Sequence, residues 1–105
     1  MTKLTYHIPP GFLDTPILSV DLETTGIKGT QPNPRRDETL LIALTNAKKE
    51  TIVLRPGDWI AELFNVLDDP NVTILMHNGK FDIKFLKALG YLGRVPGLWD
   101  TMLVE

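Results

Sequence analysis

The chain has 105 residues, 43% of them hydrophobic, and a formal net charge of −2. This length suits one small domain, and the charge excludes an overall basic field that would attract nucleic acid. Cysteine is absent, which excludes disulfides, zinc–thiolate sites and thiol nucleophiles and suits a reducing, cytoplasmic location. The longest aliphatic run, "LLIAL", is too short to span a bilayer, so no membrane association is expected.

The first strong pattern is a predicted strand that ends in two acids. Residues 1–15 contain three prolines or glycines and are expected to form a loose lead-in. Residues 17–23 then predict a strand, in which Asp21 and Glu23 share one face, about 6 to 7 Å apart at the backbone. Two carboxylates this close favour a divalent cation between them, and Mg²⁺ and Mn²⁺ prefer oxygen ligands. The same alternation is also typical of a half-exposed strand without a metal.

The rest of the chain predicts a mixed α/β sheet with helices on its faces. Apolar runs separated by a short polar turn predict an antiparallel strand pair, and apolar residues at helical spacing predict the helices. Asp58 is a candidate N-cap of the first helix, and Gly90 a candidate C-cap of the second. The expected elements are strands at residues 39–46, 51–55 and 72–77, and helices at residues 59–67, 80–89 and from about residue 100.

A second group of polar residues lies in "HNGKFD", where a strand turns into a helix. Asp82 occupies the first helical turn, where the helix dipole favours a carboxylate. If the two strands run parallel, Asp82 meets Asp21 and Glu23 at the carboxyl edge of the sheet, where ligands bind in open α/β sheets. Three carboxylates there would suit the two metal ions of phosphoryl transfer. Taken singly, Asn78 is more typical of a plain helix N-cap, and Asp82 of a plain first-turn charge, than of a functional site.

Taken together, three segments resemble a known family. "VDLETTG", "HNGKFDIKFL" and "WDTMLVE" resemble motifs of the DEDD 3′–5′ exonucleases, most of all the proofreading domains of family A (DNA polymerase I type) polymerases. The resemblance implies an RNase H-like mixed sheet of five strands whose first three are antiparallel. It also implies two divalent ions, Mg²⁺ or Mn²⁺, and hydrolysis of the terminal phosphodiester of single-stranded DNA, with RNA left open as a substrate.

The resemblance also implies roles for individual residues. The catalytic, metal-binding acids of the family match Asp21, Glu23 and Asp82. Positions that contact the terminal nucleotides match Thr24, Ile27 and Asn78. Asp100 matches a position with a structural or indirect role and not a metal ligand.

The sequence departs from the family in one respect. The third motif, Tyr-x-x-x-Asp or His-x-x-x-x-Asp, does not follow Asp82; Tyr91, for example, is followed four residues later by Val95. We therefore expect a partial exonuclease domain that ends before the last strand and helix and is inactive without its C-terminal part or a complementing chain. Two alternatives stay open: an RNase D-like exoribonuclease, and a non-catalytic truncated or split-gene remnant that acts with a partner chain.

Overall fold

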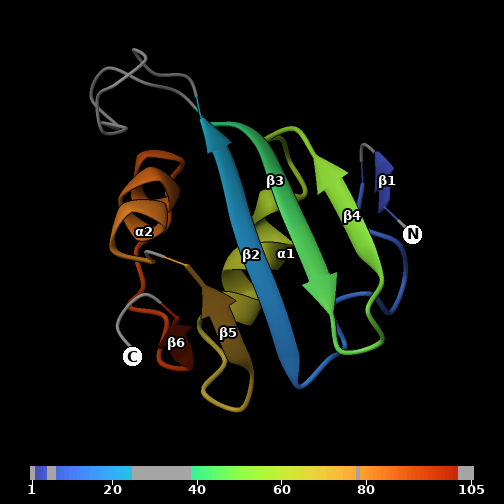
Figure 1. Ribbon diagram of the computed structural model, residues 1–105. Coiled ribbons are helices and arrows are strands. Elements are labelled where there is room, and N and C mark those ends of the chain that lie inside the picture. The colour runs from blue at the N-terminus through green and yellow to red at the C-terminus, as the bar shows by residue number, and fades with distance from the viewer. Residues whose placement is uncertain (1, 5–6, 25–38, 78, 102–105) are drawn as a thin grey trace.

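The computed structural model describes residues 2–4, 7–24, 39–77 and 79–101. In this part of the chain, six strands form one sheet in the order β1-β4-β3-β2-β5-β6, and two helices accompany it (Figure 1). The elements are β1 (Thr2–Leu4), β2 (Ile17–Thr24), β3 (Thr39–Asn46), β4 (Thr51–Leu54), α1 (Ile60–Leu67), β5 (Thr73–Met76), α2 (Gly79–Ala88) and β6 (Leu98–Asp100). The predicted mixed α/β fold is confirmed. Neither of these helices is long and apolar enough to cross a membrane.

Strand direction is what positions the functional residues. β3 is antiparallel to both β2 and β4. The short polar turn predicted the pairing of β3 with β4, and the family resemblance implied the pairing of β3 with β2. β5 runs parallel to β2, and β6 runs parallel to β5. The carboxyl ends of β2, β5 and β6 therefore lie at the same edge of the sheet.

Two short strands lie where the sequence predicted none. β1 falls in the expected lead-in and pairs with β4. β6 occupies residues predicted as a loop and a helix start, so the predicted helix from about residue 100 is wrong. Strands of three residues have no readable alternation. Backbone bonds to a neighbouring strand decide β6: Ile74 N–H donates to the Gly97 carbonyl, and Thr101 N–H donates to the Met76 carbonyl, both at 2.9 Å.

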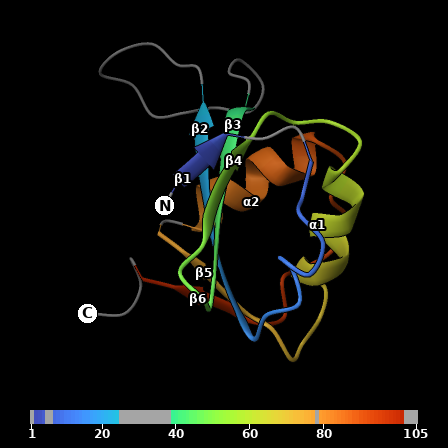
Figure 2. The ribbon, with the colours of Figure 1, turned by 90° about the vertical axis from the view of Figure 1, so that its right-hand side faces the viewer.

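Both helices cover the same face of the sheet (Figure 2). Along β2, Leu18 and Val20 are buried against them, whereas Asp21 points to the other face and is exposed. Leu63 and Leu67 of α1 are fully buried in the same core. Side chains alternate between the two faces of a strand and recur every 3.6 residues along a helix. The apolar side chains of both therefore meet in one layer between the sheet and the helices.

Tyr91 ties the end of α2 to the end of α1. Its ring is buried, 5.3 Å from the ring of Phe64. Its hydroxyl donates to Asp68 Oδ1 at 2.7 Å and accepts from Val95 N–H at 2.8 Å. Burial and the bond to the Asp68 carboxylate raise the pKa of Tyr91 to about 12. This tyrosine is therefore engaged in holding the fold together.

Removing this hydroxyl in Tyr91→Phe should lower the free energy of unfolding by about 1 to 3 kcal/mol, because it leaves Val95 N–H and Asp68 without that partner. Urea denaturation of the two proteins measures the difference. Equal stability would contradict a structural role for the hydroxyl.

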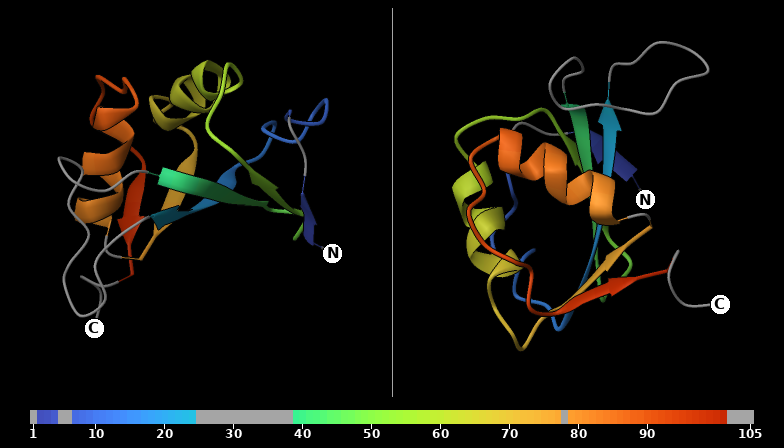
Figure 3. Two further views of the ribbon diagram at one scale, coloured as in Figure 1. Left: turned by 90° about the horizontal axis from the view of Figure 1, so that it is seen from above. Right: turned by 90° about the vertical axis from the view of Figure 1, so that its left-hand side faces the viewer.

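Neither helix covers the opposite face of the sheet (Figure 3). The strand register sets Ser19, Leu75 and Trp99 in one row across that face. Ile17 and Trp99, both on this face, are 41% and 51% exposed. Apolar side chains on an open sheet face favour association with another surface.

We expect the 105-residue chain to form oligomers as its concentration rises, and Trp99→Lys to weaken this association because it places a charge on the open face. Sedimentation velocity at increasing concentration measures the effect. Leu92→Lys is the matched control, since Leu92 is 95% exposed but lies outside the sheet. A monomer at every concentration would contradict the expectation.

Candidate active site

The candidate site lies at the edge where the three parallel strands end. α2 starts directly after β5 and lies beside the carboxyl-terminal half of β2 (Figure 1). Asp21 lies on β2, His77 follows β5 and Asp100 ends β6. Parallel pairing therefore gathers polar residues from three separate parts of the sequence, as expected for a ligand-binding edge.

Asp82 shows how close these acids come to one another. Its carboxyl group is half-buried in the first turn of α2. Burial, and then the negative charges of Asp21 and Asp100, raise its pKa from 3.8 to about 7. Three carboxylates from a strand, a helix and a second strand thus interact electrostatically. The parallel strands thus bring the charge of Asp21 close enough to act on Asp82, and the shared site of Asp21, Glu23 and Asp82 stays a prediction.

The other predicted site residues are placed differently. Glu23 is exposed on the same face of β2 as Asp21, and a β-bulge separates it from the half-buried Thr24. Ile27 and Asn78 lie outside the described residues. Among the residues that are described, no three His, Cys, Asp or Glu side chains are arranged to hold one metal ion. The metal-binding roles of Asp21, Glu23 and Asp82 therefore stay predictions.

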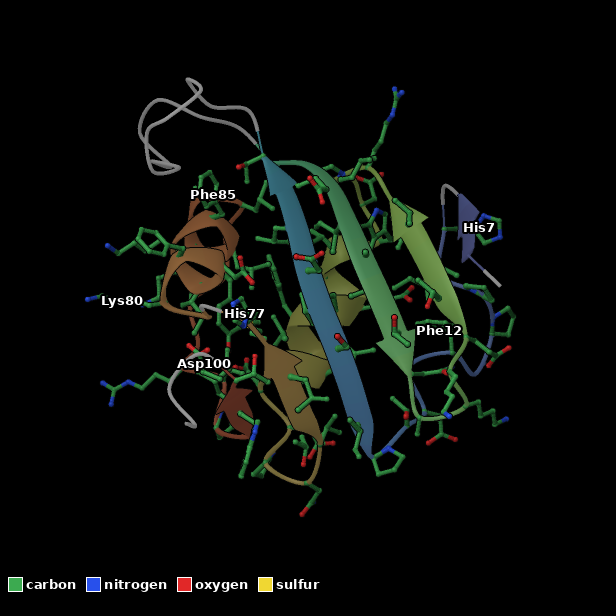
Figure 4. All side chains as sticks on the ribbon, viewed as in Figure 1. His7, Phe12, His77, Lys80, Phe85 and Asp100 are labelled. Carbon is green, nitrogen blue, oxygen red and sulfur yellow. The ribbon has the colours of Figure 1, made fainter. Side chains whose placement is uncertain are left out.

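Asp100 is the member of this group whose place the sequence did not predict. Its side chain is buried, and its Oδ2 accepts the N–H of Gly79, at the start of α2, at 2.8 Å. Next to it, Thr101 Oγ1 lies 2.9 Å from Nδ1 of His77. Figure 4 shows His77 and Asp100 below the start of α2, whereas Lys80 points away into solvent. The Asp-Thr pair at residues 100–101 could have indicated this role, but its pattern was interpreted as the start of a helix.

Two surface hollows lie elsewhere. One, of about 510 Å³, is lined by His7, Glu62 and residues 55–59. The other, of about 640 Å³, is lined by residues 9–12 and 48–52. His7 and Phe12 lie toward the β1–β4 end of the strand order, away from α2 (Figure 4). None of the interacting acids lines either hollow.

Comparison with known families identifies the domain. A family model described as 3′–5′ exonuclease matches residues 12–105. The chain belongs to the 3′–5′ exonuclease family. The resemblance of its three motifs to the DEDD exonucleases is thereby confirmed. A comparison with curated protein sequences gives no match.

Solved structures of exonucleases share the fold. Brucella melitensis NrnC with bound Mg²⁺ is 20% identical, with a TM-score of 0.68, over 95% of this chain and 48% of that one. The catalytic core of RRP6 from Trypanosoma brucei is 18% identical, with a TM-score of 0.70, over 96% and 29%. Escherichia coli RNase D is 25% identical, with a TM-score of 0.63, over 87% and 23%. The chain thus spans about half the length of NrnC, and less of the other two.

The pKa of Asp82 predicts a pH dependence of folding. Between pH 3.8 and about 7 the folded chain holds a proton that the unfolded chain has released. The free energy of unfolding of wild type relative to Asp82→Asn should therefore fall as pH rises through this window, and level off above it.

Urea denaturation across this pH range measures that difference. Glu62→Gln, which changes an exposed acid of α1, is the control and should follow wild type. A constant difference between wild type and Asp82→Asn across the window would show that the burial and the neighbouring charges do not act on Asp82 as described.

Proposed function

We propose that this chain is the N-terminal part of a two-metal-ion 3′–5′ exonuclease of the proofreading type found in family A DNA polymerases, located in the cytoplasm. The observation that supports it best is the parallel β2–β5 pairing, which brings Asp21 into electrostatic contact with Asp82. The pair lies within the family match over residues 12–105. The substrate would be the 3′ end of single-stranded DNA.

The acids of this edge have the chemistry that a hard divalent cation requires. Carboxylate oxygens are the preferred ligands of Mg²⁺ and Mn²⁺. Asp82 lowers the repulsion from Asp21 and Asp100 by taking up a proton, and a cation would lower the same repulsion. We assign the ions to Asp21, Glu23 and Asp82. When bound, they would supply an activated water and stabilise the leaving oxygen. NrnC, which shares the fold, has bound Mg²⁺.

The reaction would be hydrolysis of the terminal phosphodiester. The oxygen of water bonds to phosphorus, the bond from phosphorus to the 3′ oxygen of the preceding nucleotide breaks, and that oxygen takes a proton. Thr24, Ile27 and Asn78 would contact the terminal nucleotides and hold this bond next to the acids. A fourth acid would come from the C-terminal part of the domain or from a complementing chain.

An RNase D-like exoribonuclease is the second candidate. Escherichia coli RNase D is an exoribonuclease involved in structured RNA processing. The two chains are 25% identical over a match that covers 87% of the present chain. NrnC has also been solved bound to pGG. Discrimination between RNA and DNA depends on contacts to the 2′-hydroxyl. A direct comparison of the two substrates therefore separates the candidates.

The test is to supply the missing acid. The 105-residue chain alone should digest 5′-labelled single-stranded DNA slowly or not at all. Extension with a segment that carries Tyr-x-x-x-Asp, or addition of that segment as a second chain, should give Mn²⁺-dependent shortening from the 3′ end. Asp21→Ala, Glu23→Ala and Asp82→Ala should each reduce the rate by about 10²-fold or more, because they displace the reacting groups.

The control is Glu62→Ala, an exposed acid of α1 that should leave the rate unchanged. Faster digestion of RNA than of DNA would favour the RNase D-like candidate. If the extended chain stays inactive, the non-catalytic remnant is the better description. Full activity in Asp82→Ala would overturn the assignment of these acids.

A further inference from the structure

The turn between β5 and α2 is held on both sides by the end of β6. On one side, Asp100 Oδ2 accepts the N–H of Gly79 at 2.8 Å. On the other, Thr101 Oγ1 lies 2.9 Å from His77 Nδ1. Asp100, the last residue of β6, thus contacts Gly79, the first residue of α2. Thr101, which follows β6, contacts His77, which lies just before α2.

The contact with Gly79 is closely fitted. Asp100 is only 8% exposed, and Gly79 is buried as well. A Cβ on residue 79 would lie 3.3 Å from Asp100 Oδ2 and 3.2 Å from the Cβ of Met76. A larger residue would therefore require these neighbours to move by a few tenths of an ångström. Little room is thus left for a side chain where the start of α2 meets the end of β6.

The backbone of β6 gives these side chains a fixed base. Met76 and Asp100 are partners in the parallel ladder. Thr101 N–H donates to the Met76 carbonyl at 2.9 Å, and the hydroxyl of Thr101 approaches the same carbonyl at 3.4 Å. The side chains of Asp100 and Thr101 thus reach from a strand whose position is set by β5 to the helix that β5 leads into.

We propose that Asp100 and Thr101 form a positioning clamp that fixes the start of α2 and thereby directs Asp82 toward Asp21. Asp82 lies in the first turn of α2, so any shift of Gly79 carries its carboxyl group with it. The inference rests on the proposed function, because the placement of Asp82 has a consequence for catalysis only if Asp82 is one of the reacting acids. A displacement of about 1 Å costs on the order of 10²-fold in rate at such sites.

The first test measures hydrogen exchange of the Gly79 amide by NMR in Asp100→Ala and Asp100→Asn. Both variants remove the charge, but only asparagine keeps an oxygen that accepts the Gly79 N–H. The amide should exchange roughly fivefold faster or more in Asp100→Ala than in Asp100→Asn, the effect of losing one capping bond. Asp58→Ala is the control: this exposed acid precedes α1, where the sequence predicted a cap, but Trp59 is the N-cap and no side chain caps that helix.

The second test asks whether the clamp places Asp82. Mn²⁺ is titrated into the same two variants, and the concentration that broadens the NMR signals of Asp82 is compared. That concentration should be several-fold higher in Asp100→Ala than in Asp100→Asn. Because both variants carry the same net charge, the difference reports position and not attraction to the ion. The two variants are compared under conditions in which both are fully folded. A difference in their Mn²⁺ responses then does not come from a difference in stability.

Equal Gly79 exchange in the two Asp100 variants would overturn the proposal, and so would equal responses to Mn²⁺. If Asp100→Ala does not fold, Thr101→Val and Thr101→Ser decide the question, since both His77 and Thr101 are exposed. Serine keeps the hydroxyl that contacts His77, and valine does not, so only valine should weaken the Mn²⁺ response. The exchange measurement needs neither metal nor substrate, so a failure of the clamp is distinguishable from a failure of the proposed nuclease function.

Discussion

The parallel pairing of β5 with β2 is the constraint on which the rest of the site depends. In an antiparallel arrangement, the end of β5 would lie at the opposite edge, far from Asp21. The observed register pairs Ser19 with Leu75, so β5 ends beside the middle of β2, next to the half of β2 that carries Asp21. α2 then begins beside β2, and its first turn brings Asp82 to the acid that β2 supplies. β6 repeats the direction and adds Asp100.

The edge concentrates negative charge in a way that does not favour folding. Asp82 is half-buried, and this burial, together with the negative charges of Asp21 and Asp100, raises its pKa. Tyr91 is the opposite case, because its buried hydroxyl bonds both Asp68 and Val95. Strongly perturbed carboxyl groups are typical of functional sites, where local stability is given up for chemistry.

Sequence patterns predicted the elements that are long enough to repeat. β2, β3 and both helices are long enough for their apolar residues to recur at the spacing of a strand or a helix. The Asp-x-Glu pair and the Asp of "HNGKFD" indicated the candidate acids. The patterns did not predict β1 or β6, because three-residue strands are specified by the strands beside them and not by their own side chains. The resemblance implied a structural or indirect role for Asp100, but its contact with Gly79 was not predicted, because that contact exists only once β6 has paired with β5.

The pairing of β2 with β5 also affects how the chain folds. β2, β3 and β4 follow one another in the sequence, whereas Ile17 pairs with Thr73, from a distant part of the chain. Contacts of such long sequence separation pay their loop-closure entropy late and slow folding. Asp21 and Asp82 therefore come together only when this non-local pairing has formed. A ligand of that edge would find no partly folded form to bind, and its whole binding energy would add to the stability of the native state.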